Sequence, residues 1–170
     1  RKVYVANFTD NTVSIVDMGA NRVVATVPVG QGPSFPISFP IRRRLYVTNV
    51  TSNTVSVIDL ESNSVVTTIP VGTGPRDLRI RRDLEKAYVA NRDGASVSVL
   101  DLVTNTVLRT IPAGGRVRTR VFGTRGVIAN ETDNNIIIFD TVTDSVLATL
   151  PVPGGPRDIR FSVEGSKAYI

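Results

Sequence analysis

Short runs in which apolar and polar residues alternate recur along the whole chain. Ser96–Asp101, with the sequence Ser-Val-Ser-Val-Leu-Asp, is one of them. Alternation with a period of two is typical of a β-strand that turns one face toward a core. Clusters of Gly, Pro, Asn and Asp separate the runs and indicate turns. No segment has the spacing of an amphipathic helix or the length of an apolar membrane-spanning helix. The pattern therefore predicts an all-β protein.

The alternating runs belong to a repeat of about 40 residues. Tyr46-Val47-Thr48-Asn49 returns in altered form at 4–7, 88–91 and 127–130, and the chain ends on Tyr169-Ile170. Successive copies start 42 residues apart, except the step from 88 to 127, which is 39. Each period divides into four strands, here called a to d, with a expected innermost. Four short antiparallel strands per period indicate a β-propeller blade, which must stack on its neighbours to bury both faces.

The strand pattern also predicts where the blades lie. We expect a single domain over 1–170, with blades at about 3–28 (strands b to d), 33–70, 75–112, 115–151 and 157–170 (strands a and b). Three arrangements fit: an open arc of a larger propeller, a four-blade ring closed by strand exchange, or half of an eight-blade ring made by two chains. We favour the arc, because both ends of the sequence fall inside blades.

Several motifs carry a resemblance to a known family. The letters YVTN stand at 46–49, NTVSVID at 53–59, IPVG at 69–72, and GPRD at 74–77 and 155–158. Through them the chain resembles the YVTN family of β-propeller repeat proteins of bacteria and archaea. The resemblance implies an exported, periplasmic or cell-surface protein, in many cases a surface-layer or adhesion protein. Related propellers include a streptogramin lyase, lactonases and the haem-d1 domain of nitrite reductase.

Composition narrows the chemistry that the chain can perform. It contains no Cys and no His, which excludes thiol nucleophiles, imidazole bases and Cys/His zinc sites. We assign no catalytic residue, cofactor or metal site. Aromatic residues make up 6% of the chain, and 17 of the 20 basic residues are Arg. Neither a stacking platform nor a nucleic-acid-binding motif is present.

Arginine is concentrated in strand a and its hairpin. The stretches 33–45, 75–86, 114–126 and 156–167 together carry +10, whereas the whole chain carries +5, so the remainder carries −5. This predicts a molecule with a basic channel side and acidic outer strands and turns. We take four arginines as anion-binding candidates, with Arg79 and Arg160 at equivalent positions and Arg118 near the same place: Arg79, Arg118, Arg120 and Arg160. The alternative is solvated charge with structural pairs such as Arg76–Asp77 and Arg157–Asp158.

Three polar side chains recur once per repeat. An Asp ends strand c, an Asn ends strand b, and a Tyr begins the YVTN-like segment: Asp17, Asp59, Asp101 and Asp140; Asn7, Asn49, Asn91 and Asn130; Tyr4, Tyr46, Tyr88 and Tyr169. We expect the Asp and Asn side chains to cap turns. The alternatives are a carboxylate ring for Ca²⁺ and, at Asn7, Asn49 and Asn130, glycan acceptor sites. We expect the Tyr residues to pack in the core.

These observations favour a non-enzymatic binding or structural β-propeller, exported or on the cell surface, that contacts a protein or glycan through its loops. An acidic partner would suit the basic strands. The alternative is a lyase- or lactonase-type enzyme with a metal in the central channel. A third interpretation is an arginine-lined channel for a small anionic ligand. The exposed terminal strands offer a route to self-association.

Overall fold

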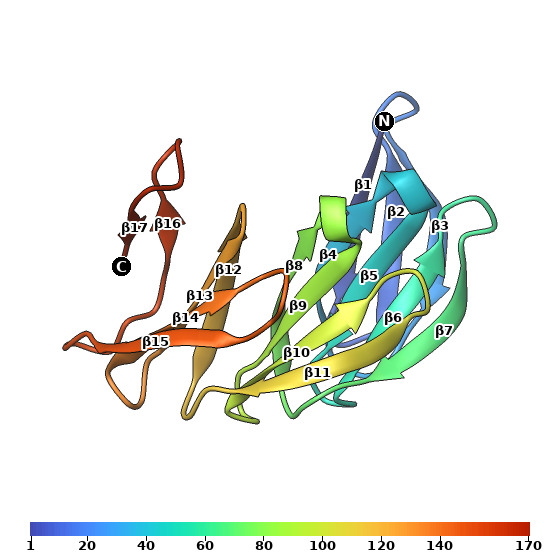
Figure 1. Ribbon diagram of the computed structural model, residues 1–170. Helices are drawn as coiled ribbons and strands as arrows, with labels where there is room; N and C mark the ends of the chain where they lie inside the picture. Colours follow the sequence, from blue (N-terminus) through green and yellow to red (C-terminus); the bar gives the residue numbers. More distant parts are fainter.

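The chain folds into five antiparallel sheets arranged along an arc, as a computed structural model of residues 1–170 shows (Figure 1). The first sheet has three strands, the next three have four each, and the last has two. The strands are β1 (Lys2–Asn7), β2 (Thr12–Asp17), β3 (Arg22–Pro28), β4 (Pro33–Phe39), β5 (Arg44–Asn49), β6 (Thr54–Asp59), β7 (Ser64–Pro70), β8 (Pro75–Arg81), β9 (Lys86–Asn91), β10 (Ser96–Asp101), β11 (Thr106–Pro112), β12 (Val117–Phe122), β13 (Arg125–Asn130), β14 (Asn135–Asp140), β15 (Val146–Pro151), β16 (Arg160–Phe161) and β17 (Ala168–Tyr169). The predicted all-β fold of four-stranded blades is confirmed.

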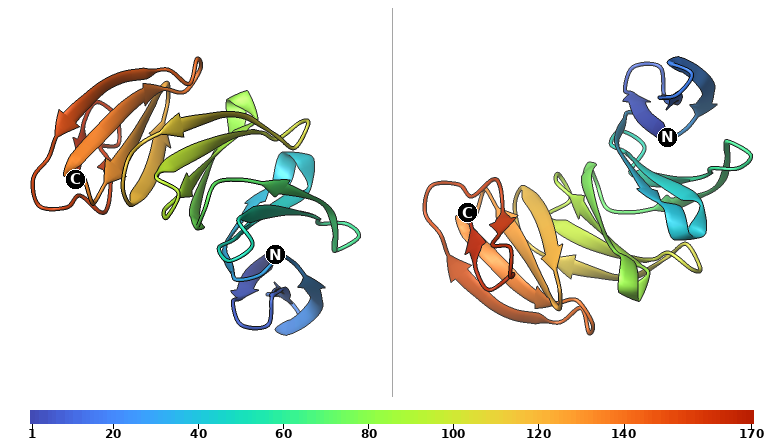
Figure 2. Two further views of the ribbon diagram at one scale, coloured as in Figure 1. Left: turned by 90° about the horizontal axis from the view of Figure 1, so that it is seen from below. Right: turned by 90° about the horizontal axis from the view of Figure 1, so that it is seen from above.

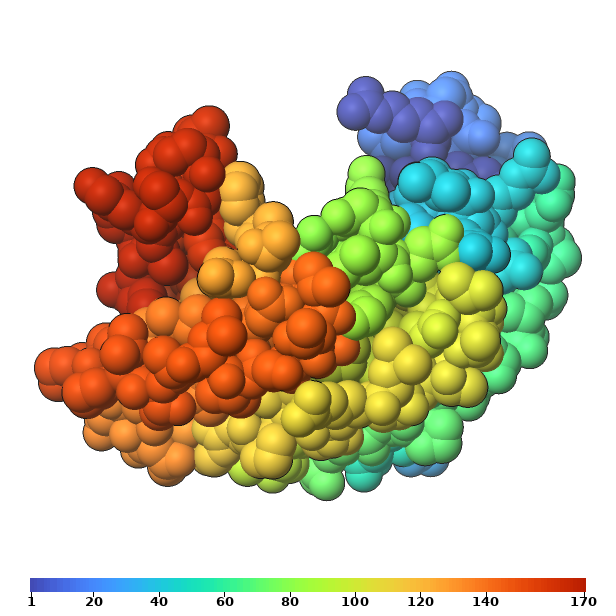
Figure 3. Space-filling view, viewed as in Figure 1, coloured from blue at the N-terminus to red at the C-terminus, as the bar shows by residue number.

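Each sheet is a meander in which sequence neighbours pair, so strand a lies at one edge and strand d at the other. The a-strands of neighbouring blades, β4, β8 and β12, contact one another on the concave side (Figure 2). The two ends of the chain lie at opposite ends of the arc, which is hollowed between them (Figure 3). Strands β16 and β17 pair with each other and not with β1 to β3, so strand exchange does not close a four-blade ring here.

The core consists of apolar layers between blades. One layer joins Tyr46, Val55 and Val57 of one blade to Leu78 and Val89 of the next. The following layer joins the opposite face of that second blade, including Tyr88 and Val97, to the blade after it. Successive side chains of a strand point to opposite faces of the sheet. A central blade is covered on both faces, so it needs apolar residues at odd and at even positions of its strands. This explains why the strands b contain runs such as Tyr-Val-Ala rather than strict alternation.

The Tyr residues also connect blades through their hydroxyl groups. Tyr88 is fully buried, and its hydroxyl lies 2.9 Å from both the Thr141 carbonyl oxygen and Asp144 Oδ1 in the c–d turn of the next blade. Tyr46 makes the equivalent but longer contacts, 3.3 Å to the Leu102 carbonyl and 3.1 Å to Asn105 Oδ1. Burial raises the pKa of Tyr46 to about 12, so its hydroxyl remains a donor at neutral pH. The expected core packing is confirmed for Tyr46 and Tyr88 and is wrong for Tyr169, which is exposed.

The c–d turns are closed by the recurring Asp residues. Asp59 Oδ1 accepts hydrogen bonds from the backbone N–H groups of Glu61 and Ser62 at 2.9 and 2.8 Å, and the same pattern recurs at Asp17, Asp101 and Asp140. Four residues after each Asp, the backbone has a positive φ: Asn21, Asn63, Asn105 and Asp144. Asn and Asp tolerate this left-handed conformation best among non-Gly residues. The turn-capping interpretation is confirmed, and no three acidic side chains gather into a metal-binding group.

The recurring Asn residues correct two expectations. The Asn49 side chain is fully buried, and its Nδ2 donates at 2.9 Å to the hydroxyls of Thr54 and Ser56 on the neighbouring strand. Asn7 and Asn91 make the same cross-strand bonds. Asn130 instead donates to the Ala113 carbonyl and to Asp133, and it caps its turn by accepting from the Thr132 and Asp133 amides. Turn capping is therefore wrong for three of the four. The buried Nδ2 of Asn49 and Asn130 cannot carry a glycan in the folded protein.

Two of the three complete a–b hairpins contain a short 3₁₀ turn, η1 (Pro40–Arg42) or η2 (Arg82–Leu84). The third, between β12 and β13, has only Gly123 and Thr124 between its strands. The 3₁₀ turns are the only helical segments, and no helix in the structure is long or apolar enough to cross a membrane. The third hairpin is two residues shorter than the other two, and this difference affects the alignment of the arginines in β12.

Candidate functional site

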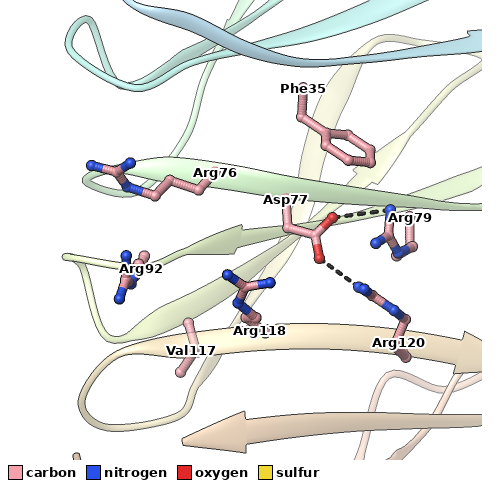
Figure 4. Close-up of a pocket in the computed structure, with 8 residues that line it drawn as sticks. All are labelled: Phe35, Arg76, Asp77, Arg79, Arg92, Val117, Arg118 and Arg120. Atoms are coloured by element: carbon pink, nitrogen blue, oxygen red, sulfur yellow. Dashed lines mark hydrogen bonds and ion pairs between the residues drawn. The ribbon is translucent and has the colours of Figure 1, made fainter. Parts of the chain in front are cut away.

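The inner strands β8 and β12 line a cavity of about 180 Å³ that opens onto the concave side (Figure 4). Five arginines, one aspartate and two apolar residues surround it: Arg76, Arg79, Arg92, Arg118, Arg120, Asp77, Phe35 and Val117. Five guanidinium groups and one carboxylate give this lining a net charge of 5 − 1 = +4. We call this cavity the arginine pocket.

The strand register shows which arginines are equivalent. Arg79 pairs across the strand with Tyr88, Arg120 with Val127, and Arg160 with Tyr169, so these three arginines occupy one position in successive blades. Each also donates to the carbonyl of its preceding residue, at 3.1, 2.9 and 3.1 Å respectively. The expected equivalence of Arg79 and Arg160 is confirmed, and Arg120 is the third member.

Arg118 lines the same cavity as Arg79, near it as expected, but the two positions are not equivalent. Arg118 pairs with Ala129 as Asp77 pairs with Ala90, so Arg118 stands at the position that holds Asp77 in the preceding blade. The β8–β9 pair contains a bulge that skips Arg76, whereas the β12–β13 pair runs from Val117 to Arg118 without one. The shorter third repeat thus lacks one bulge residue and two hairpin residues. Arg118 replaces an acidic residue with a basic one on the concave side.

Asp77 holds two of the five arginines. Its Oδ1 lies 3.0 Å from Arg79 Nη1, and its Oδ2 accepts a hydrogen bond from Arg120 Nη1 at 2.6 Å. The side chains of Asp77, Arg79 and Arg120 are 10, 22 and 19% exposed, so the interactions are shielded from solvent. Burial lowers the pKa of the Arg79 guanidinium, Asp77 opposes that change and Arg120 adds to it. An arginine nonetheless stays protonated in proteins.

The same ion-pair chain continues into the last blade. Arg120 Nη2 lies 3.4 Å from Asp158 Oδ1, which Arg160 Nη1 contacts at 2.8 Å. Burial works to raise the pKa of Asp158, but the Ile159 N–H, Arg160 and Arg120 together bring it below its usual value. Arg160 is 66% exposed and does not line the pocket. The structure therefore brings together three of the four sequence candidates, Arg79, Arg118 and Arg120, and leaves Arg160 outside.

The other side of Asp77 holds the remaining arginines. Figure 4 shows Arg76, Arg92 and Arg118 on one side of Asp77, with Arg79 and Arg120 on the other. Arg76 and Arg118 are exposed and form no ion pair, and Arg92 has only a 3.4 Å contact with Glu131, which also binds Arg157 at 2.7 Å. The expected pairs Arg76–Asp77 and Arg157–Asp158 are therefore wrong. Asp77 binds Arg79 and Arg120 instead, and Asp158 binds Arg120 and Arg160.

Sequence reasoning missed several lining residues. Arg92 lies in the b–c turn after β9 and not in a strand a, so a search along strand a could not find it. Phe35 comes from the preceding blade, and its ring lies 4.9 Å from the Arg79 guanidinium carbon, a cation–π contact. The GPRD motif did contain Arg76 and Asp77, but its sequence alone does not show that both line one cavity and bind different partners.

The predicted separation of charge is only partly correct. In a four-stranded antiparallel meander, strands a and c run in the same direction. The a–b hairpin and the c–d turn, which follow these two strands, therefore lie at the same end of the blade. Arg43 binds Glu61, Arg44 binds Asp59, and Arg125 binds Asp140 at that end. Basic hairpins and acidic turns therefore neutralise one another there. In the arginine pocket, by contrast, Arg76 and Arg118 have no acidic partner.

Sheets of this topology around an arc define a β-propeller, and a comparison with protein families gives a more specific result. The model of the YNCE-like β-propeller family matches residues 37–123, just over half of the chain. The chain belongs to the YNCE-like β-propeller family. No curated protein matches it by sequence.

Two solved structures share the fold. Kuenenia stuttgartiensis hydrazine synthase superposes with a TM-score of 0.86 at 22% identity, covering 98% of this chain and 51% of that one. Dihydro-haem d1 dehydrogenase NirN, solved in complex with DHE, gives a TM-score of 0.81 at 20% identity, covering 98% of this chain and 38% of that one. This chain thus spans about half or less of each neighbour. At such low identity, the likeness shows the fold.

Proposed function

We propose that this protein is a non-enzymatic binding propeller whose arginine pocket holds an anionic group of a protein or glycan partner. The observation that carries the proposal is the replacement of an acidic position by Arg118. Asp77 and Asp158 neutralise the arginines of their own blades, whereas Arg118 adds a guanidinium group with no partner. Unpaired charge gathered around a cavity departs from the local pattern of the repeat, and such departures are expected at functional sites.

The electrostatics of the pocket favour anions over cations. Guanidinium groups are planar donors whose geometry matches carboxylate and phosphate oxygens. A divalent cation would be repelled by five arginines, and the one carboxylate, Asp77, is already paired with two of them, which disfavours the channel-metal alternative at this place. The moderate burial of Arg79 and Arg120 also reduces the screening that salt imposes on exposed pairs.

We further propose an exported or cell-surface location, on the strength of the YVTN-like motifs at 46–49 and their resemblance to exported propellers. The partner would then be met outside the cytoplasm. Fractionation of the source cells, with immunodetection in the periplasmic, surface and cytoplasmic fractions, tests this part separately. Recovery in the cytoplasmic fraction alone would refute it.

Anion binding is tested by isothermal titration calorimetry with inorganic phosphate and with citrate at low ionic strength. Arg118→Gln should weaken binding by about 10-fold or more, since a hydrogen bond to a charged group contributes about 1.5–3 kcal/mol. Arg109→Gln is the matched control, because it removes the same charge from an exposed site on the outer strand β11. Equal weakening by both variants would show a response to net charge alone and would contradict the proposal.

A further inference from the structure

The arginine pocket has more free donor groups than a carboxylate can use. Arg76 comes from the bulge of β8, Arg118 from β12 and Arg92 from the turn after β9. Three separate segments therefore direct guanidinium groups to one half of one cavity (Figure 4). Two of these groups have no acidic partner, and the third has only a 3.4 Å contact.

The two remaining arginines, Arg79 and Arg120, are already paired with Asp77. Asp77 accepts from Arg120 at 2.6 Å and lies 3.0 Å from Arg79, and Arg79 also rests on the Phe35 ring. Asp77 thereby keeps Arg79 and Arg120 on its far side. A ligand entering the pocket would meet Arg76, Arg92 and Arg118 first.

Carboxylates differ from phosphate and sulfate monoesters in the number of oxygen atoms that can accept hydrogen bonds. Each guanidinium fork binds two oxygens side by side, and a carboxylate has only two oxygens with about four lone-pair sites, which two forks fill. A phosphate or sulfate monoester has three terminal oxygens in a tetrahedral arrangement and can be approached by several forks at once. A phosphate monoester also carries a charge of −1.5 to −2 at pH 7.

The size and walls of the cavity indicate that the anion is attached to an organic group. One water needs roughly 10–15 Å³ of such space. The cavity of about 180 Å³ therefore has room for an oxyanion and the first atoms bonded to it. Phe35 and Val117 supply apolar surface within the otherwise charged lining.

We infer that the arginine pocket selects a terminal phosphate or sulfate monoester over a carboxylate. The inference rests on the proposed function, since it specifies the anion that the same pocket would hold. Arg76, Arg92 and Arg118 bind the terminal oxygens, and the ester-linked group lies toward Val117, which Figure 4 shows on the same side of Asp77 as Arg92 and Arg118. Asp77 acts as a positioning residue that holds Arg79 and Arg120 away from the ligand.

Four small probes with one common aromatic body test the inference: phenyl phosphate, phenyl sulfate, diphenyl phosphate and benzoate. Affinities are measured by calorimetry at pH 7.5, in low salt and again at 0.15 M. Phenyl phosphate should bind at least about 10-fold more tightly than benzoate or diphenyl phosphate, each of which offers only two free oxygens. Phenyl sulfate, with three terminal oxygens but one negative charge, should fall between them.

A pH series separates charge from shape. The second pKa of a phosphate monoester is about 6, so lowering the pH from 7.5 to 5 should weaken phenyl phosphate binding and leave phenyl sulfate unchanged. Arg118→Gln and Arg76→Gln should each weaken phenyl phosphate binding by about 10-fold or more, and Arg109→Gln by less than about 2-fold. Far-UV circular dichroism confirms that each variant is folded.

The outcomes divide clearly. Benzoate binding as tight as phenyl phosphate binding, with the same loss in Arg118→Gln, would overturn the inference and leave the proposed anion site intact. No binding of any of the four probes would overturn the inference and count against the proposed function. Binding that is unaffected by Arg76→Gln and Arg118→Gln would place the anion elsewhere and would also overturn the inference.

Discussion

The hydroxyl of Tyr88 offers the sharpest test of how the blades are held together. Tyr88→Phe removes one oxygen atom and leaves the ring, with its 5.2 Å packing distance to Phe139, in place. The lost hydroxyl lies 2.9 Å from Asp144 Oδ1 and 2.9 Å from the Thr141 carbonyl. Asp144 is only 6% exposed, so water cannot readily replace the missing donor.

The structure also supplies the matched comparison. Tyr46→Phe removes the equivalent oxygen, but its acceptors are neutral and farther away, at 3.1 and 3.3 Å. A hydrogen bond to a charged group contributes about 1.5–3 kcal/mol, and one between neutral groups about 0.5–1.5 kcal/mol. For a chain of this size, 1 kcal/mol corresponds to about 2–4 °C in Tm. We therefore expect Tyr88→Phe to lower the Tm by about 3–12 °C and Tyr46→Phe by about 1–6 °C, with the larger loss in Tyr88→Phe.

The assay is thermal and urea unfolding followed by far-UV circular dichroism, with both single variants and the wild type at one protein concentration. A double-mutant cycle of Tyr88→Phe with Asp144→Ala measures the coupling between the two side chains directly. Lys86, whose Nζ lies 2.7 Å from Asp144 Oδ2, is unchanged in the Tyr88 variant and keeps one carboxylate oxygen satisfied. A Tyr88→Phe loss no larger than that of Tyr46→Phe, together with zero coupling to Asp144, would refute the reasoning.

Three further predictions test the packing, the buried polar groups and the turns. Gly126→Ala should destabilise the protein by about 1–3 kcal/mol in urea unfolding, because its new Cβ would clash with the Phe139 ring opposite, and Phe139→Leu should restore part of the loss; a neutral Gly126→Ala would contradict this. Asn49→Ala should cost about 1–3 kcal/mol and Asn7→Ala clearly less, since both lose the same two hydroxyl contacts but only Asn49 is fully buried; equal losses would show that burial is irrelevant here. Hydrogen bonds from backbone N–H groups lower the pKa values of Asp17, Asp59 and Asp140 in the folded protein. The stabilisation by these carboxylates is therefore fully present above the unfolded pKa of about 3.9 and is lost as the pH falls through the lower folded pKa values. A urea midpoint of unfolding that increases as the pH falls below about 4 would contradict this prediction.

The fold could be predicted because the signal that specifies it is local and repeated. Ser96–Asp101 alternates strictly enough to reveal a strand, and Asp101 with Asn105 marks the turn that follows. Copies of this pattern every 39 or 42 residues favour stacked blades, an arrangement that buries both faces of each sheet. Comparison with the YNCE-like family and with solved propellers confirms that result.

The site could be predicted only in part, because it depends on register. The third repeat is three residues short, and the sequence does not reveal that one is lost from a bulge and two from a hairpin. Arg118 therefore aligns with Asp77 and Arg120 with Arg79, an alignment that depends on where the three residues are lost. Arg92 and Phe35 reach the pocket from other elements, a relation that exists only in three dimensions.

The tyrosine contacts have a consequence for how such a protein can grow. Tyr46 of one blade reaches Asn105 of the next, and Tyr88 reaches Asp144 of the one after that. One copy of the repeat therefore carries the donor for its following neighbour and the acceptor for its preceding neighbour. Duplicating a single 42-residue unit inserts a blade whose two interfaces already match those on either side. Gene duplication can thus lengthen the array without any compensating substitution at the junctions.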